Sequence, residues 1–272
     1  DYDITDTAAA LISAGDEVLN DAGVDIVAVD DGPTNAGDGK ILAGFTADVE
    51  FDVSDNAASV ISVMSENEEA ASLVEANSIT VNDGPVSAGD GGILAGFTAD
   101  VEFDVVDDAN AIVAELGASG FGPGGLDEAN DVVVSGGNVD TSEADAIQDI
   151  AEYAASASDY DITDTAAALI SAGDEVLNDA GVDIVAVDDG PVNAADGMVL
   201  AGFTADVEFD VEDNANAIAQ TEEVYEEVYT EQDVVDAASS VGVIAGASIG
   251  IPLEPENYFY ELLDANDFSE NN

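Results

Sequence analysis

Short runs of alternating apolar and acidic residues recur along the chain, and they predict β-strands. In the stretch DVEFDV, Val49, Phe51 and Val53 alternate with three acidic residues, Asp48, Glu50 and Asp52. A period of two places one set of side chains on each face of a strand. We therefore expect the apolar set to point into a core and the acidic set to face solvent.

Connectors rich in Ala, Gly and acidic residues separate these runs. The stretch 7–23 is predicted to be helical because Asp6 and Thr7 precede it and Gly23 ends it, as helix caps do. We predict that 34–45 is a compact connection and not a helix, since its three glycines weaken a helix. The stretch 54–76 is the strongest helix candidate. The predicted strands are centred near Ile4, Ile26, Phe51, Ile79, Phe103, Val133, Ile162, Ile184, Phe209 and Val243.

The chain repeats itself extensively. Residues 1–33 recur without change at 159–191, and the match continues with a few substitutions to Ala57 and Ala215. A third, partial copy covers 82–111, and the phrase LAGFTADVEFDV occurs at 42–53, 94–105 and 200–211. Internal repetition on this scale determines the architecture, so the fold must be one that can be extended by adding copies.

The repeats predict an elongated α/β solenoid of stacked strand–helix or strand–loop repeats, with one parallel β-sheet. Each repeat has an apolar strand face and an apolar connector face that it cannot bury alone, and stacking of neighbours buries both. Strands joined by helical crossovers pair in parallel. We divide this solenoid, residues 1–220, into sub-repeats 1–76, 77–158 and 159–220.

Two stretches break the pattern. Residues 117–128 are rich in glycine and are predicted to form a loop. Residues 221–272 are not repeat-like and are predicted either to cap the last repeat or to dock onto a neighbouring subunit. Within them we expect an apolar strand that needs a cover, formed by Val241, Val243, Ile244, Ile249 and Ile251.

The stretches YDITDTAAALISAGDEVLNDAGVDIVAVDDGP (2–33) and FDVSDNAASVI (51–61) resemble units of large secreted surface proteins of bacteria and archaea. The resemblance covers about 1–115 and 155–220. It implies an extracellular repeat module of an adhesin, a surface layer or a secreted fibre. This chain departs from such units by placing Asp or Glu where they more often carry Thr, Ser or Asn.

The charge of the chain excludes several functions. It has 62 acidic residues, one basic residue (Lys40) and no His, Cys or Trp, with a formal net charge of −61. Disulfides, iron–sulfur sites and Ser-His-Asp triads are therefore ruled out. Nucleic acids and anionic membrane surfaces would repel such a chain. Paired carboxylates could hydrolyse glycosides, but no feature singles out one pair among so many acids. We expect no enzyme.

The acidity indicates a salt-rich setting. With 47% hydrophobic residues the chain can build a core, so the charge does not indicate disorder. Concentrated salt screens carboxylate repulsion within about 3 Å at 1 M, which favours a halophilic protein; a marine or calcium-rich secreted protein is the alternative. No apolar run is long enough to span a bilayer. The sequence begins DYDITD without Met or a signal peptide, so we expect either a processed leader or a fragment, and an extracellular or cell-surface location.

The acidic strand faces and turns are the candidate sites. On neighbouring parallel strands the carboxylates are predicted to form ladders of like charge, which a cation atmosphere or bound Ca²⁺ would offset. Neither an EF-hand loop nor a glycine-rich calcium nonapeptide is present. The alternative is a solvated surface on which Asp-Asn-Ala and Asp-Thr-Ala only cap helices. The candidate calcium or cation ligands are Asp30, Asp31, Asp52, Asp55, Asp83, Asp104, Asp107, Asp188, Asp189, Asp210 and Asp213.

Together these features predict a structural protein, the self-associating subunit of a filament or cell-surface layer in a high-salt or calcium-rich environment. Its partners are expected to be cations and further copies of itself, joined head to tail or through strands such as DYDITD. A calcium-stiffened adhesin module that binds another surface is one alternative. A structural protein of a virus that infects a halophile is the other.

Overall fold

The computed structural model describes residues 2–65, 73–97, 99–118, 126–213 and 238–243. It is an α/β structure in which the strands pair in parallel. The chain forms two compact units. Unit 1 holds Asp1–Gly136 and Ala146–Ser158, and unit 2 holds Gly137–Asp145 and Asp159–Asn272.

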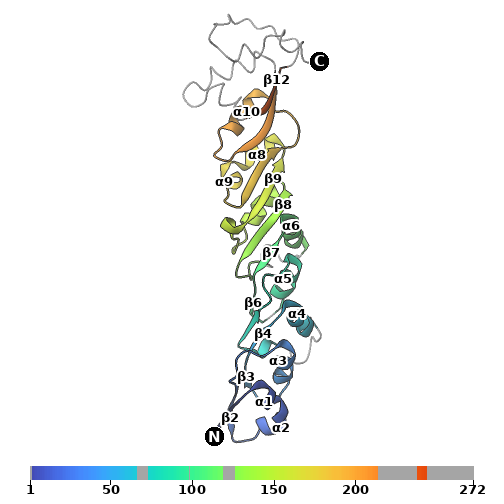
Figure 1. The fold of residues 1–272 in the computed structure, drawn as a ribbon, viewed down its shortest axis with the longest axis vertical. Coiled ribbons are helices and arrows are strands. Elements are labelled where there is room, and N and C mark those ends of the chain that lie inside the picture. The colour runs from blue at the N-terminus through green and yellow to red at the C-terminus, as the bar shows by residue number, and fades with distance from the viewer. Residues whose placement is uncertain (1, 66–72, 98, 119–125, 214–237, 244–272) are drawn as a thin grey trace, which may run out of the picture. The chain divides into compact units, whose positions relative to one another are not determined.

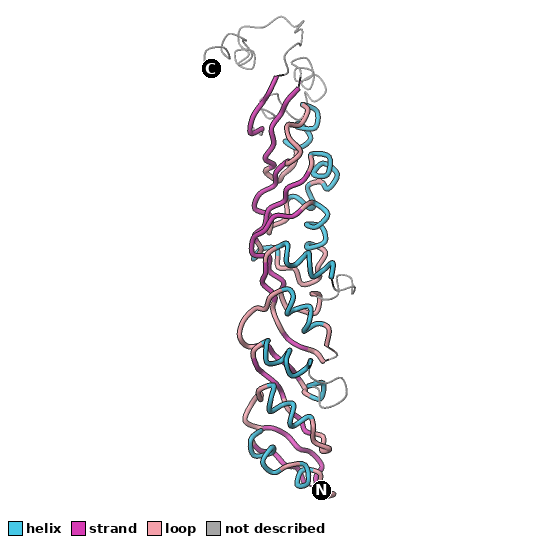
Figure 2. Tube along the Cα trace, turned by 90° about the vertical axis from the view of Figure 1, so that its right-hand side faces the viewer, coloured by secondary structure: helices cyan, strands magenta, loops and turns pink. Residues whose placement is uncertain are grey.

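Unit 1 alternates strands with short helices, and its helices lie along one face of its strands (Figures 1 and 2). Two elements cross the boundary between the units: β8 (Val132–Val139) begins in unit 1 and α7 (Thr141–Gln148) ends in it. The other strands are β1 (Tyr2–Asp6), β2 (Val24–Val29), β3 (Val49–Glu50), β4 (Asp52–Asp55), β5 (Ser78–Val81), β6 (Val101–Glu102) and β7 (Val105–Asp107). The other helices are α1 (Ala8–Ala14), α2 (Asp16–Leu19), α3 (Ala36–Ala43), α4 (Ala57–Ser65), α5 (Ala88–Ala95) and α6 (Ala109–Ala118), with 3₁₀ turns at Leu73–Glu75 and Ala155–Ala157.

The strands of unit 1 do not form the one sheet that the repeats predicted. β1, β2 and β3 form one three-stranded sheet, and β4, β5 and β6 form another. The break lies at Phe51, because β3 before it pairs with β2 whereas β4 after it pairs with β5. The same break recurs at Phe103, between β6 and β7. A strand that changes partner halfway therefore ends one sheet and begins the next.

Unit 2 repeats the pattern with the same order of elements: β9 (Asp159–Asp164), α8 (Ala166–Ala172), α9 (Asp174–Leu177), β10 (Val182–Val187), α10 (Ala194–Ala201), β11 (Val207–Asp213) and β12 (Ala238–Val243). Its helices again lie on one side of its strands (Figures 1 and 2). β9 pairs with β10, β10 with β11, and β11 with β12, all in parallel.

The predicted strand positions are confirmed. Eight of the ten centres lie within strands, and the other two, Phe51 and Phe103, lie between two short strands. The predicted faces are also confirmed, since Val49, Phe51 and Val53 are at most 4% exposed. Asp48, Glu50 and Asp52 are exposed. The same alternation holds at 100–105 and 206–211, so period-two patterning identified the core face of every copy of this phrase.

Identical sequence gives identical local structure in the two units. Tyr2 pairs with Val24 and Ile4 with Val27, and the equivalent pairs in unit 2 are Tyr160–Val182 and Ile162–Val185. The helix predicted over 7–23 is capped by the Thr7 side chain but is interrupted at Gly15, where φ is 74°. That left-handed backbone suits glycine and starts a separate short helix, α2.

The prediction of a non-helical connection at 34–45 is wrong. Ala36–Ala43 form helix α3, which begins after the cap residue Asn35, and α5 and α10 are its counterparts. The glycines were read as helix breakers, but they let the helix approach the sheet. A Cβ on Gly39 would lie 2.9 Å from Val53 Cγ2, and one on Gly91 would lie 2.8 Å from Val105 Cγ2. Close packing thus outweighs low helix propensity here.

Several predictions fall wholly or partly outside the described residues. These are residues 119–125 of the glycine-rich loop, 66–72 of the helix candidate 54–76, and 221–237 and 244–272 of the C-terminal segment. Within the C-terminal segment the predicted apolar strand is present in part, as β12. Of the helices that the structure describes, none is long and apolar enough to cross a bilayer.

Two glycines of α5 test the role of close packing. Gly89→Ala should raise the free energy of unfolding by about 0.5–1 kcal/mol, because nothing lies within 4 Å of its Cβ position and alanine favours the helix. Gly91→Ala should lower it by about 1 kcal/mol, because overpacking costs about 1–3 kcal/mol against a helix gain of about 1. Urea unfolding followed by circular dichroism measures both. Equal stabilisation by the two substitutions would contradict the packing role of Gly91.

Candidate functional site

The candidate cation ligands divide into two groups by what their carboxylates contact. Six of the eleven accept a hydrogen bond from the first backbone N–H of a helix that precedes them in the chain. The donor lies 19, 23 or 26 residues upstream, so each contact joins one strand–helix segment to the next. The pairs are Ala8–Asp31 (3.0 Å), Ala36–Asp55 (3.0 Å), Ala57–Asp83 (3.0 Å), Ala88–Asp107 (3.0 Å), Ala166–Asp189 (3.1 Å) and Ala194–Asp213 (3.3 Å).

Three of these aspartates lie in tight turns of the sequence Asp-Gly-Pro. Asp31, Asp83 and Asp189 are each followed by a glycine with φ between 96° and 102°. Only glycine adopts this backbone without strain, so the glycine fixes the turn from which the carboxylate reaches the helix. The residue that donates is alanine in all six pairs, and each of these alanines is buried. A larger side chain at that position would have to be accommodated in the core.

The aspartates at strand ends join two helix starts with one carboxylate. Asp55 accepts from the N–H of Asn56 through Oδ1 (2.8 Å) and from the N–H of Ala36 through Oδ2 (3.0 Å). Asp107 does the same between Asp108 and Ala88. The first N–H groups of a helix have no acceptor within the helix, and the positive end of the helix dipole favours a negative charge there. Each carboxylate therefore stabilises its own helix start and links it to the preceding one.

Asp164 has the same geometry, although it was not among the predicted ligands. Its Oδ1 accepts from the N–H of Thr165 (2.7 Å), and its Oδ2 accepts from the N–H (3.1 Å) and hydroxyl (2.7 Å) of Thr141. Partial burial raises the pKa of Asp164. The bonds from Thr141 and Thr165 outweigh that effect, so its pKa lies below the ordinary value.

A second kind of acidic contact was also missed. Asp16 accepts from the hydroxyl of Thr46 (2.7 Å) and from the N–H groups of Thr46 (2.6 Å) and Ala47 (3.2 Å). Asp174 holds Thr204 and Ala205 in the same way in unit 2. The hydroxyl bonds, followed by the N–H bonds, lower the pKa of both carboxylates. Asp16 is the first residue of α2, and Asp174 is the first residue of α9. Each carboxylate holds the loop that leads from the next helix of the chain, α3 or α10, to the strand after it.

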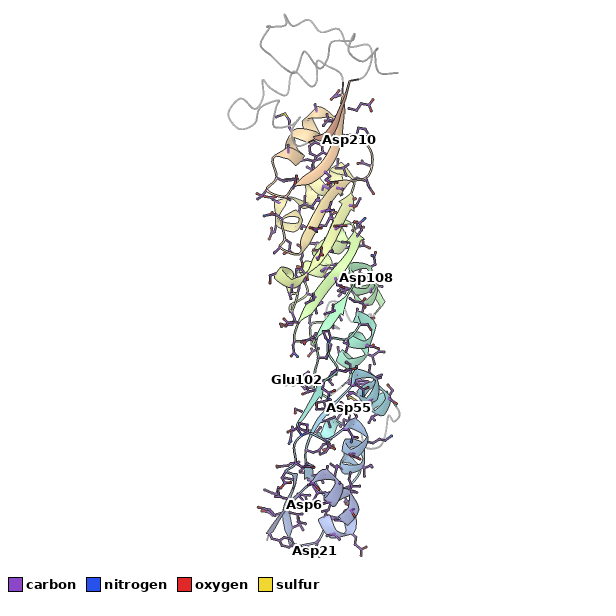
Figure 3. All side chains as sticks on the ribbon, in the orientation of Figure 1. Asp6, Asp21, Asp55, Glu102, Asp108 and Asp210 are labelled. Carbon is purple, nitrogen blue, oxygen red and sulfur yellow. The ribbon has the colours of Figure 1, made fainter. Side chains whose placement is uncertain are left out.

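The other five predicted ligands lie on exposed turns and on the exposed strand face. Asp30 and Asp188 are exposed in turns, and Asp52 accepts from the hydroxyl of Ser78 (2.8 Å). Asp104 is exposed between β6 and β7, and Asp210 is exposed on β11. Figure 3 labels Asp55 and Glu102, which represent the helix-start positions and the outer strand face. Among the residues that the structure describes, no three acidic side chains converge as a group that could hold a metal ion.

The prediction of like-charge ladders is wrong for the strand pairs β1–β2, β2–β3, β4–β5, β5–β6, β9–β10 and β10–β11. No registered pair in them brings two carboxylates opposite each other. Glu50, Glu102 and Glu208 each end a row of neutral residues instead. Those rows are Thr5–Ala28–Glu50, Ser54–Thr80–Glu102 and Thr163–Ala186–Glu208. Thr80 also donates its hydroxyl to Glu102 (3.1 Å).

The sequence does carry a signal for the helix-start contacts. The Asp-Asn-Ala and Asp-Thr-Ala motifs indicated capping of the helix that follows, which is only one of the two contacts that these carboxylates make. The other contact is made with an alanine at an earlier helix start. Its signal is the fixed spacing of 19 residues between Ala36 and Asp55, which is repeated at Ala88–Asp107 and Ala194–Asp213. A constant spacing between an alanine at a helix start and a later aspartate, repeated in each copy, marks the contact between segments.

Asp164→Asn tests whether this linking carboxylate stabilises the fold through its charge. At pH 7 we expect the free energy of unfolding to fall by about 1 kcal/mol, a value discounted for the solvent exposure of the group. Because the folded pKa is lowered, this stabilisation is present above the ordinary value of 3.8 and is lost as the pH falls through the folded pKa. The difference from wild type should therefore shrink below about pH 4.

Asp161→Asn is the matched control, because it removes one charge from the same strand, β9. General relief of charge repulsion affects both variants alike, so the comparison isolates the bonds from Thr141 and Thr165. Urea unfolding at a series of pH values measures the two differences. Equal unfolding free energies for the two variants at pH 7 would refute the linking role.

Comparisons of the chain with protein-family models, curated protein sequences and solved structures found no match in any of the three. The resemblance to units of secreted surface proteins therefore remains an expectation based on the quoted motifs. Any function assigned to the chain rests on the residues and contacts described above.

Proposed function

We propose that this protein is a structural, extracellular protein, the self-associating subunit of a filament or a cell-surface layer in a high-salt or calcium-rich environment. We further propose that its strand–helix segments stack as an elongated α/β solenoid. The proposal assigns the chain no catalytic role, in keeping with its lack of His and Cys.

The observation that carries the proposal is the recurring contact between consecutive segments. The same alanine N–H and aspartate carboxylate meet at six helix starts, in both units, over spacings of 19 to 26 residues. Contacts that reach only the next segment are characteristic of repeat proteins, which grow by adding units and form extended surfaces. An architecture built in this way suits a load-bearing or space-filling role.

The distribution of charge supports a salt-rich setting. The acids cover the outer strand face and the turns, and three rows on that face place one glutamate beside neutral residues. Two carboxylates on adjacent strands, about 4.8 Å apart, would repel by about 0.9 kcal/mol in water, and at twice that distance by about 0.4 kcal/mol. The remaining repulsion is long-range, and dissolved salt screens long-range repulsion most effectively.

Electron microscopy of the purified protein tests self-association. In NaCl above about 1 M, where the screening length is about 3 Å, we expect filaments or two-dimensional sheets. At about 0.1 M NaCl, where that length is about 10 Å, we expect them to dissociate because like charges on neighbouring copies then repel. Monodisperse particles at every NaCl and CaCl₂ concentration would contradict the proposed function.

A chelator distinguishes screening from bound calcium. If the carboxylates are occupied by hydrogen bonds and screened by salt, EDTA at constant high NaCl should leave the thermal midpoint within about 2 °C, a shift that a change of under about 1 kcal/mol produces in a protein of this size. Differential scanning calorimetry measures it. Loss of fold in EDTA that CaCl₂ but not MgCl₂ restores would instead favour the calcium-stiffened adhesin module.

A further inference from the structure

The two identical copies of residues 1–33 differ in how much of their surface is covered. Tyr2 is 53% exposed, whereas its counterpart Tyr160 is 1% exposed. Val18 is 53% exposed and its counterpart Val176 is 8% exposed. Ile4 is half-buried, whereas Ile162 is fully buried. The sequence is the same, so the difference arises from what lies against it.

The hydrogen bonds show the same difference. Asp6 accepts from the N–H of Thr7 (2.8 Å), as Asp164 accepts from Thr165. The second oxygen of Asp164 also accepts the N–H and the hydroxyl of Thr141, which begins α7. No described residue supplies a counterpart of Thr141 to Asp6. The surface formed by Tyr2, Ile4, Asp6 and Val18, here called the β1 face, thus has no described strand or helix start in the place where its copy has β8 and α7.

The fold itself shows what kind of element covers such a face. In the strand order β9 lies between β10 and β8, the strand that precedes it in the chain. Gly137–Asp145, which carries the end of β8 and the start of α7, belongs to the same compact unit as β9. Among the strands that the structure describes, β1 has one sheet neighbour, β2. The place beside β1 that corresponds to that of β8 beside β9 is therefore one that a strand can occupy.

This inference rests on the proposed function and specifies its contact. We infer that the β1 face is a self-association surface that takes the outermost strand, β12, of a second copy of this chain as a parallel neighbour. Among the described strands, β12 has one sheet neighbour, β11, and the two are parallel. Strand β12 of one copy would then lie beside β1 of the next copy, in the place that β8 takes beside β9.

The chemistry of the β1 face favours this occupant over other pairings. Two β1 strands of different copies would each bring Asp3 and Asp6 to the contact, so like charges would meet. Strand β12 has the sequence Ala-Ser-Ser-Val-Gly-Val and carries no charge. An uncharged strand beside an acidic one reproduces the rows found within the sheets, where each carboxylate has a neutral neighbour. An open edge strand with an apolar face also favours pairing with another chain.

Cysteine cross-linking tests the contact, because the chain contains no cysteine of its own. Thr5→Cys labels β1, and Ser239→Cys or Ser240→Cys labels β12. Both serines are needed because successive residues of a strand point to opposite faces. After mixing and mild oxidation in high NaCl, we expect Thr5→Cys to cross-link with one of the two serine variants, and mass spectrometry to identify that disulfide. Ile26→Cys, on β2 and 43% exposed, is the control and should cross-link at least about tenfold less.

The outcomes separate this inference from the proposed function. If wild-type protein forms filaments or sheets but Thr5→Cys cross-links only with itself or with Ile26→Cys, the β12 contact is wrong and self-association stands. If wild-type protein stays monomeric under every condition, the proposed function is wrong and the β1 face has no partner of this kind. As a second readout, Tyr2→Asp should raise the concentration needed for assembly at least tenfold, and Ile26→Asp should change it little.

Discussion

The first backbone N–H groups of a helix need an acceptor from outside the helix, and much of this structure depends on how that need is met. In at least six places the acceptor is an aspartate from the next strand–helix segment. The contact fixes the distance between segments, because an alanine such as Ala36 and an aspartate such as Asp55 must meet at hydrogen-bond length. It also explains the small residue at each helix start, since that residue lies in the core. At these positions the acidic residues that make the chain so negative join consecutive segments by hydrogen bonds.

The outer strand face follows a different rule. There the carboxylates make few contacts, and the sheets keep them apart by pairing them with Ala, Ser or Thr. Spacing by one neutral strand about halves the direct repulsion between acids, from roughly 0.9 to 0.4 kcal/mol in water. The same chain therefore uses Asp in two ways, at helix starts for its hydrogen bonds and on the outer face for its hydration. The alternation along each strand gives the outer face but not the partner strand, which is why it predicted ladders that the registers do not contain.

The strands and the faces of the sheets could be predicted from the sequence, because alternation with a period of two is a local signal that every copy repeats. The helices at 36–43, 88–95 and 194–201 could not, since Gly39 and Gly91 were judged by propensity, while their role is to let the helix approach Val53 and Val105. Six of the linking aspartates were among the predicted residues and Asp164 was not, and the partners of all seven were missed. Asp55 meets a backbone N–H that lies 19 residues earlier, and no local rule identifies such a donor. The difference between Tyr2 and Tyr160 is beyond any sequence rule, because the two sit in identical sequences.

Acid and salt both reduce charge repulsion in this protein, yet they act differently on its fold. Protonation relieves repulsion between the outer carboxylates but also removes the charge that accepts at the helix starts, as at Asp164, whose lowered pKa shows that the ionised form is preferred. Dissolved salt screens charges that lie several ångströms apart, and it affects a hydrogen bond of about 3 Å between a carboxylate and a partly buried N–H much less. Concentrated salt therefore lowers the cost of the outer charges while leaving the contacts between segments intact. We therefore expect a fold joined by carboxylates in this way to be stabilised by salt and not by acid, which is the physical argument for the salt-rich environment that we propose.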